Sequence, residues 1–223
     1  MSAAARKVDA SRKFLRVPSP DSVVVAWTRT SDEHNSADLL LARTVASVLG
    51  VSPTDFTVSR LCPSCGSAAH GRPLVLSNSG PGAPFVSLAR ADDLVVVAIS
   101  TAGPVGVDVE RVDAPAFYGF DEVALHERER ARTVRERAIT WTRKESLLKA
   151  TGHGLRIDPR QLEMSAPVDP PRLLQWAAPH PPTGEPWLAD LSLDPDFVAC
   201  VTVLGVASPQ LSVQAAVQAE PPR

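Results

Sequence analysis

A chain of 223 residues is long enough for one large domain or two small ones with a sizeable core. Its 44% hydrophobic and 22% charged residues are ordinary for a soluble globular protein. The net charge of −2 gives no reason to expect nucleic acid as a partner, because nucleic-acid-binding domains usually carry a positive balance. The N-terminal residues lack the apolar core of a secretory signal, and no apolar stretch approaches the roughly 18 residues that cross a bilayer. We therefore expect a cytoplasmic monomer with neither a membrane nor a nucleic-acid partner.

In chain order, the first elements predict a tail followed by an α+β unit. Residues 1–20 are polar and basic, and we expect them to be a disordered tail. The N-terminal half is expected over residues 21–104. Its predicted elements are a strand at 21–29, a helix at 35–50 and a strand at 56–60, then a hairpin of strands 86–88 and 94–100 joined by a turn at 89–93.

A second unit, predicted over residues 105–205, repeats this plan after Pro104. It begins with a strand at 105–110 and helical segments at 124–137 and 136–151. The strands expected after them lie at 162–164, 173–177, 187–193 and 197–204. Residues 206–223 are expected to be a flexible tail. The fold class is therefore α+β, built from two similar halves.

The strand of the second unit carries the motif Gly106-Val-Asp-Val-Glu-Arg111. Residues two apart in a strand share a face, so Asp108 and Glu110 point to one side. Val107 and Val109 then point to the other side. The strand is thus predicted to present two neighbouring carboxylates opposite a buried apolar face.

The predicted helix at 136–151 carries the second motif, which runs from Trp141 to Gly152. Helical spacing places a mixed set of side chains on one broad face: Trp141, Lys144, Glu145, Leu148 and Lys149. If this helix packs on the strand, three carboxylates and two ammonium groups converge.

Such a group of carboxylates predicts a divalent cation. Two carboxylates about 4 Å apart repel by roughly 4 kcal/mol at a surface-like dielectric, and oxygen ligands favour Mg²⁺. Taken separately, each motif has a plainer interpretation. Asp108 and Glu110 fit a solvated strand face, Glu145 and Lys149 fit a surface ion pair, and Trp141 fits a core position.

Together, the two motifs resemble the 4′-phosphopantetheinyl transferases. The pattern is Gly-x-Asp-x-Glu, followed by Trp-x-x-Lys-Glu-x-x-x-Lys-Ala-x-Gly-x-Gly, which ends at Gly154. The similarity is to the larger, surfactin-synthetase-activating type and runs from about Val23 to about Val203, strongest over 71–154. The resemblance implies two similar α+β halves with the active site between them.

The resemblance also implies an activity, that of a holo-acyl-carrier-protein synthase. Such enzymes transfer the phosphopantetheine arm of coenzyme A to a serine of an acyl or peptidyl carrier protein and release adenosine 3′,5′-bisphosphate. Phosphoryl transfer depends mainly on positioning and charge neutralisation. Asp108, Glu110 and Glu145 are the expected Mg²⁺ ligands, and Lys149 is expected to neutralise the leaving phosphate.

Two further residues of this half are assigned from the resemblance. Glu129 aligns with a glutamate proposed as the base that deprotonates the carrier serine; His126, Glu127 and a metal-bound water are the alternatives. Lys144 is expected to assist coenzyme A binding, with an outward structural role as its alternative. The arginines between residues 128 and 135 are candidates for docking an acidic carrier protein.

For the nucleotide end, Gly71-Arg72-Pro73 matches a segment that contacts adenosine in the family. Arg72 and Pro73 are therefore expected to bind coenzyme A. The family's Ser-His-Ser segment is replaced by Ala89-Arg90-Ala91, so we expect Arg90 to take over a phosphate contact. Relatives also carry several basic residues before the first helix, where this chain has only His34.

Two other hypotheses remain open from the sequence. Cys62, Cys65 and His70 resemble part of a zinc knuckle, which would make the chain a zinc-stabilised binding module, although a fourth ligand is not evident. Reduced thiols on a surface turn are the plainer interpretation of this segment. The change at Ala89-Arg90-Ala91 also allows a family member that has lost its activity.

Overall fold

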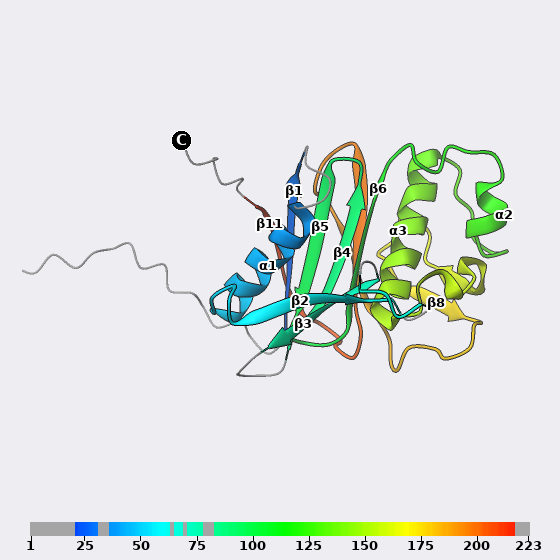
Figure 1. Ribbon diagram of the computed structural model, residues 1–223. Helices are drawn as coiled ribbons and strands as arrows, with labels where there is room; N and C mark the ends of the chain where they lie inside the picture. The colour runs from blue at the N-terminus through cyan, green and yellow to red at the C-terminus, as the bar shows by residue number, and fades with distance from the viewer. Residues whose placement is uncertain (1–20, 31–35, 63–64, 69–70, 78–82, 217–223) are drawn as a thin grey trace, which may run out of the picture.

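The computed structural model describes residues 21–30, 36–62, 65–68, 71–77 and 83–216. The first half contains β1 (Ser22–Arg29), α1 (Ser36–Leu49), β2 (Phe56–Leu61), β3 (Arg72–Ser77), β4 (Phe85–Ala91) and β5 (Leu94–Ser100). The strands β1, β5 and β4 pair antiparallel in that order, and a strand from near the end of the chain joins the same sheet in parallel beside β1. The strands β2 and β3 form a separate hairpin, which crosses toward the C-terminal end of α3 and β8 (Figure 1).

The second half begins with β6 (Val105–Arg111), the short α2 (Phe120–Ala124) and the long α3 (Val134–Thr151). Two 3₁₀ turns, Gly154–Arg156 and Pro159–Gln161, follow α3. The remaining strands are β7 (Leu162–Met164), β8 (Leu173–Trp176), β9 (Trp187–Leu191), β10 (Phe197–Val203) and β11 (Gln210–Ala215). The strands β6, β10 and β9 form an antiparallel sheet, and β7 pairs with β8.

The order of elements is the same in both halves. Each half has a strand, a helix, a two-stranded hairpin and two further strands, and α2 and β11 are additions to this shared order. Within each half, the last strand lies between the first strand and the one before it, giving β1-β5-β4 and β6-β10-β9, and β11 extends the first of these sheets beside β1. The chain is therefore a mixed α+β protein.

The two main sheets pack face to face and each is covered on its outer side by a helix (Figure 1). Between the sheets lies an apolar core that includes Val23, Val96, Val107 and Val201. Helix α1 buries Leu41 and Val45 against the outer face of β5. Because β5 is covered on both faces, all seven of its residues are buried, which explains its unbroken apolar sequence.

The edge strands of the two sheets meet where β4 lies beside β6. The backbone N–H of Val107 donates a hydrogen bond to Ser87 Oγ, 3.0 Å away. This contact crosses from one half to the other next to the motif strand. The strand that carries the first motif is thereby placed against the first half.

The long helix α3 has well-defined ends. Thr133 and Glu136 form a capping box at its start, in which each side chain accepts a hydrogen bond from the other residue's backbone. Gly152 ends the helix with a φ of 76°, a left-handed conformation that glycine adopts without steric cost. Within the described residues, no helix is both long enough and apolar enough to cross a membrane.

The structure corrects three of the predicted elements. The helix predicted at 124–137 is wrong, because residues 125–133 are irregular between α2 and α3. Several backbone N–H groups in this segment bind side chains, and Glu129 accepts from the N–H of His126. Such side-chain bonds compete with helix formation, and they depend on tertiary neighbours.

The other two corrections add one strand and lengthen another. Residues 210–215 are not a flexible tail, because β11 pairs in parallel with β1 from Gln210 to Ala215. The turn predicted at 89–93 is shorter, because β4 continues to Ala91 and only Asp92 and Asp93 separate it from β5. The predicted tail at 1–20 and the end of the other tail, 217–223, lie outside the described residues.

Candidate active site

Helix α3 lies unusually close to β6, and Gly106 makes this approach possible. A Cβ atom on Gly106 would lie 1.9 Å from the carbonyl oxygen of Ser146 and 2.5 Å from the backbone nitrogen of Ala150. Both atoms belong to the helix backbone, so no side-chain rotation could relieve the clash. The glycine of the first motif therefore allows the second motif to pack directly on it.

This packing pairs Asp108 on β6 with Lys149 on α3. Lys149 Nζ donates a hydrogen bond of 2.6 Å to Asp108 Oδ1. Asp108 is only 5% exposed, and burial raises the pKa of its carboxyl group while Lys149 opposes that shift. The other oxygen, Oδ2, is buried and has no hydrogen-bond partner among the described residues.

Glu110 is held by the first residue of the helix motif. Trp141 Nε1 donates to Glu110 Oε1 at 3.3 Å, and the indole ring packs edge-to-face on Phe120 with centroids 6.1 Å apart. Burial and then the charge of Asp108 raise the pKa of Glu110. Asp108 and Glu110 thus lie on the same face of β6, as their spacing predicts, and that face is turned toward α3.

Glu145 completes the group of carboxylates from the helix. Burial raises the pKa of Glu145 to about 7, and Asp108 and Glu110 add to the shift by repulsion. Its Oε1 atom is buried and has no hydrogen-bond partner among the described residues. We call Asp108, Glu110 and Glu145 the carboxylate cluster.

The carboxylate cluster fits a hard divalent cation by its chemistry. It offers only oxygen atoms, and two of them are buried without a hydrogen-bond partner in the described part of the chain. The described residues do not, however, include three His, Cys, Asp or Glu side chains already arranged as a metal-ligand set. Binding of a cation therefore requires rearrangement of these side chains, including the Lys149–Asp108 contact.

A cavity of about 240 Å³ lies next to the cluster and is formed by both halves of the chain. From the first half come Gly71, Arg72 and Pro73 at the start of β3 and Ser87 and Leu88 on β4; from the second half come Lys149, Gly152, His153 and Gly154. Burial lowers the pKa of the Arg72 guanidinium. The structure thus brings Arg72, Pro73 and Lys149 together in the wall of one cavity.

Gly71 has a local role in this arrangement. Its φ is 107°, and a Cβ atom there would lie 2.4 Å from the carbonyl oxygen of Leu61. Only glycine allows the chain to enter β3 so close to the end of β2. The tight approach directs Arg72 toward the cavity.

The structure places Lys144 and Glu129 elsewhere, in a buried ion pair on another side of α3. Lys144 is fully buried, and its Nζ donates to Glu129 Oε2 at 2.6 Å and to the carbonyl oxygens of Ala124 and Pro159. Glu129 also accepts from the backbone N–H groups of His126 and Met164. Every donor of this ammonium and both carboxylate oxygens are therefore engaged in holding the segment before α3.

Arg90 does not line the cavity either. It lies in β4 opposite Val95, and its Nε donates to the carbonyl oxygen of Asp92 at 3.0 Å. The side chain therefore contacts the turn of its own hairpin. Of the predicted zinc ligands, Cys62 and Cys65 lie at the end of β2 and in the turn after it, and His70 lies outside the described residues.

Two residues near the site escape the sequence analysis. His153 lines the cavity, and its only sequence signal is its position between the two glycines that end the second motif. Arg143 is fully buried in α3 and binds Asp190 through two bonds of 3.0 and 2.6 Å, together with backbone carbonyls of residues 165–169. A buried arginine looks like a surface charge in the sequence, because its partners are far away along the chain.

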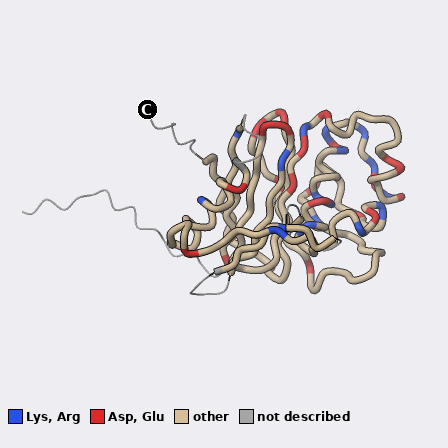
Figure 2. The backbone as a smooth tube through the Cα atoms, in the orientation of Figure 1, with Lys and Arg blue, Asp and Glu red and all other residues tan. Residues whose placement is uncertain are grey.

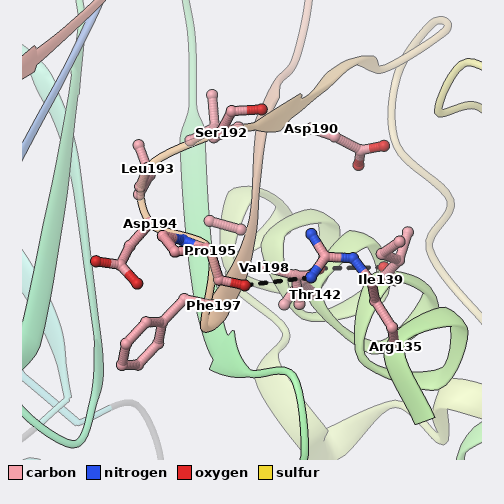
Figure 3. A pocket seen from close by; sticks show the side chains of 12 residues that line it. Arg135, Ile139, Thr142, Asp190, Ser192, Leu193, Asp194, Pro195, Phe197 and Val198 are labelled. Carbon is pink, nitrogen blue, oxygen red and sulfur yellow. Dashed lines mark hydrogen bonds between the residues drawn. The ribbon is translucent and has the colours of Figure 1, made fainter.

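A second cavity, of about 420 Å³, lies beside the N-terminal part of α3 (Figure 3). Its walls are mainly apolar, and they include Ile139, Leu191 and Phe197. Arg135 lies across it and donates to the carbonyl oxygen of Pro195 at 3.3 Å. None of the predicted site residues lines this cavity, so it carries none of the chemistry of the carboxylate cluster.

Charged residues are concentrated in the second half (Figure 2), which contains both motifs.

Comparison with known proteins gives a match that lies in this second half. No curated protein matches the chain significantly. Residues 104–199 match the sequence model of the 4′-phosphopantetheinyl transferase superfamily, and this segment carries the whole carboxylate cluster and Lys149.

Proposed function

We propose that this protein transfers the 4′-phosphopantetheine arm of coenzyme A to a serine of an acyl or peptidyl carrier protein. The observation that carries the proposal is the position of Lys149. Its ammonium binds Asp108 of the carboxylate cluster, and its side chain also lines the cavity that contains Arg72. A cavity with two cations beside a group of carboxylates suits a ligand that carries phosphates and a bound cation. The superfamily match over residues 104–199 supports the same reaction.

In this proposal, Asp108, Glu110 and Glu145 hold Mg²⁺. The support is the all-oxygen donor set, the two buried oxygens that have no hydrogen-bond partner in the described part of the chain, and the raised pKa of Glu145. When bound, Mg²⁺ supplies a positive charge that polarises the pyrophosphate and offsets the repulsion among the carboxylates. Trp141 orients Glu110 through its indole N–H.

The remaining roles follow from the cavity. Arg72 and Pro73 contact the nucleotide portion of coenzyme A, and Lys149 neutralises charge that develops on the leaving phosphate. Lys144, Glu129 and Arg90 are not included among the substrate contacts. Lys144 and Glu129 are bonded to each other away from the cavity, and Arg90, whose Nε donates to the carbonyl oxygen of Asp92, does not line it. The base that accepts the serine proton stays unassigned.

Membership of the larger type of 4′-phosphopantetheinyl transferase is part of the proposal. The repeated connectivity of the two halves, with a cavity between them, supports the larger type that contains two similar halves in one chain. The carrier protein approaches the second half, where Arg128, Arg130 and Arg132 precede α3 on an irregular segment. Acidic carrier surfaces suit such a group of arginines.

The decisive experiment is incubation of the protein with coenzyme A, Mg²⁺ and an apo carrier protein, followed by mass spectrometry of the carrier. We expect the carrier to gain the mass of the phosphopantetheine arm, and the gain to disappear when EDTA removes the cation. Asp108→Asn and Glu145→Gln should abolish transfer, because each removes a cation ligand while keeping the side-chain shape. Asp113→Asn is the matched control, since Asp113 lies near the end of β6 and pairs with exposed Arg111. A carrier of unchanged mass after long incubation with several apo carriers would contradict the proposed activity.

Lys149→Ala tests the role of the lysine within the reaction. If the ammonium acts mainly as charge develops on the leaving phosphate, kcat should fall more than KM for coenzyme A rises. The opposite pattern would make Lys149 a ground-state binding residue. Circular dichroism of the variant checks that the fold is retained.

A further inference from the structure

His153 follows the residue that ends α3 and lies in the wall of the same cavity as Arg72 and Lys149. The neighbouring glycines, Gly152 and Gly154, both have positive φ values and carry no side chain that would separate the imidazole from the cavity. His153 is therefore the third nitrogen-containing side chain that both halves bring to this cavity. The catalytic roles proposed above do not use it.

The imidazole of His153 is oriented by two aromatic neighbours. Its ring is stacked on His180, with centroids 6.4 Å apart and planes inclined by 14°, and it contacts Trp176 with centroids 6.0 Å apart. His180 has a φ of 56°, a conformation that residues other than glycine seldom adopt. The ring of His153 is thus held between the cavity and a second layer of side chains.

One nitrogen of His153 is left without a partner by this arrangement. Its Nδ1 atom is buried and makes no hydrogen bond to any of the described residues. A buried polar atom without a partner costs free energy, and a residue that faces a cavity can regain it by binding a ligand. The stacking explains the ring orientation but leaves this nitrogen unused.

The charges around His153 favour its neutral form when the cavity holds no anion. Burial lowers the pKa of His153, and Arg156 and His180 add to this effect. Arg156 is fixed close by, because its guanidinium donates to the carbonyl oxygens of Gly152 and His153. Arg72 and Lys149 contribute further positive charge from the cavity. A phosphate group entering the cavity would reverse this balance, because it adds negative charge beside the ring.

We propose that His153 binds a phosphate group of coenzyme A through Nδ1 and takes up a proton as the phosphate binds. The inference rests on the proposed function for its ligand, and it concerns a position that the second motif leaves unspecified. It makes His153 a binding residue that couples affinity to pH: binding should weaken as the pH rises from the pKa of His153 in the free protein to its higher pKa in the complex, and should not change further above that. In the neutral imidazole, only the tautomer with its proton on Nδ1 can donate to a phosphate oxygen. The protonated ring always donates from Nδ1 and adds a positive charge beside the phosphate, so a bound phosphate favours proton uptake.

The first test uses the unmodified protein and nuclear magnetic resonance of its imidazole groups. The resonances of His153 are assigned by their loss in His153→Asn and are followed against pH, with and without saturating coenzyme A. We expect the pKa of His153 to rise on addition of coenzyme A and, separately, on addition of adenosine 3′,5′-bisphosphate. A His153 titration curve that is the same with and without bound ligand would overturn the inference.

The second test compares two variants by calorimetry and kinetics. His153→Asn keeps a polar group near the Nδ1 position but cannot be protonated, so it should remove the proton uptake seen on coenzyme A binding in buffers of different ionisation enthalpy. It should also raise KM for coenzyme A by about tenfold at pH 6.5, the size expected for one charge-assisted hydrogen bond. His180→Asn is the matched control, because it removes the stacked ring while asparagine tolerates the left-handed backbone. It should retain the proton uptake.

The outcomes separate this inference from the proposed function. Transfer to the carrier without a change at His153 would overturn the inference alone. A pKa rise at His153 on binding coenzyme A, without transfer to any carrier, would support the inference and contradict the proposed reaction. Failure of coenzyme A to bind would overturn both.

Discussion

Replacing Gly106 with alanine tests whether the close packing of α3 on β6 assembles the site. The φ of Gly106 lies outside the left-handed range, so alanine meets no backbone strain there and its methyl group is the whole perturbation. That methyl carbon would lie 1.9 Å from the carbonyl oxygen of Ser146 and 2.5 Å from the nitrogen of Ala150. Real Cβ atoms stay at least 3.0 Å from such neighbours, so the helix must retreat by roughly 1 Å or more.

A retreat of this size affects both stability and chemistry. Forcing a methylene-sized group into a packed interface costs about 1–3 kcal/mol, which urea denaturation measures as a lowered midpoint. The same shift would lengthen the 2.6 Å bond between Lys149 and Asp108 and move Glu145 away from β6. A misplacement of about 1 Å at a reacting centre can lower the rate by about 100-fold, so we expect transfer to the carrier to fall by that order.

Gly50→Ala is the matched control for Gly106→Ala. Gly50 has a φ of 66° and no atom within 4 Å of an added Cβ, so alanine there costs only the left-handed strain of about 1 kcal/mol. The control should be slightly less stable and fully active. If Gly106→Ala kept wild-type stability and full transfer activity, the packing argument would be refuted.

Three further predictions concern residues outside the carboxylate cluster. Lys144→Met should lower the free energy of unfolding, measured by urea denaturation, by about 3–5 kcal/mol, because it leaves the carboxylate of Glu129 buried without its ammonium partner. The loss should be smaller in the Lys144→Met, Glu129→Gln double variant, and equal losses in the two proteins would argue against the ion pair. Burial raises the pKa of the Cys200 thiol to about 12, so native protein treated with iodoacetamide at pH 8 should be alkylated at exposed Cys65 and not at Cys200. Peptide mass spectrometry measures this, and alkylation of Cys200 in the native protein would contradict the prediction. Arg90→Ala should leave KM for coenzyme A within about twofold of the wild-type value in steady-state kinetics, because its guanidinium binds the turn of its own hairpin, and a marked rise would return Arg90 to the phosphate site.

The carboxylate cluster could be predicted from the sequence because it depends on two local periodicities. A period of two in β6 places Asp108 and Glu110 on one face, and the contacts with Trp141 and Lys149 confirm that this face meets α3. Spacings of four along α3 align Trp141, Glu145 and Lys149 on the side of the helix that faces β6. Each pattern lies within one short segment of the sequence, so these residues could be placed on their faces without knowing which distant segments they contact.

Helical spacing alone did not separate Lys144 from Lys149. Both were expected on one broad face, but α3 has neighbours on several sides, and Lys144 is buried against the segments that carry Ala124 and Pro159. The partner that decides its role, Glu129, lies in a segment that the sequence predicted as helix. The direction of a side chain on a helix surrounded by protein depends on which neighbour offers acceptors, and local spacing does not contain that information.

The amino-acid sequence by itself therefore determined the long helix, the residues that form the carboxylate cluster and the strands other than β3 and β11, because each follows from a local periodicity. Only the tertiary structure decided that Arg72 of one half meets Lys149 and His153 of the other, and that β11 returns to pair with β1. These contacts join segments that lie far apart along the chain. They form because the two sheets bury a shared core, which brings β4 beside β6 and the start of β3 beside the end of α3.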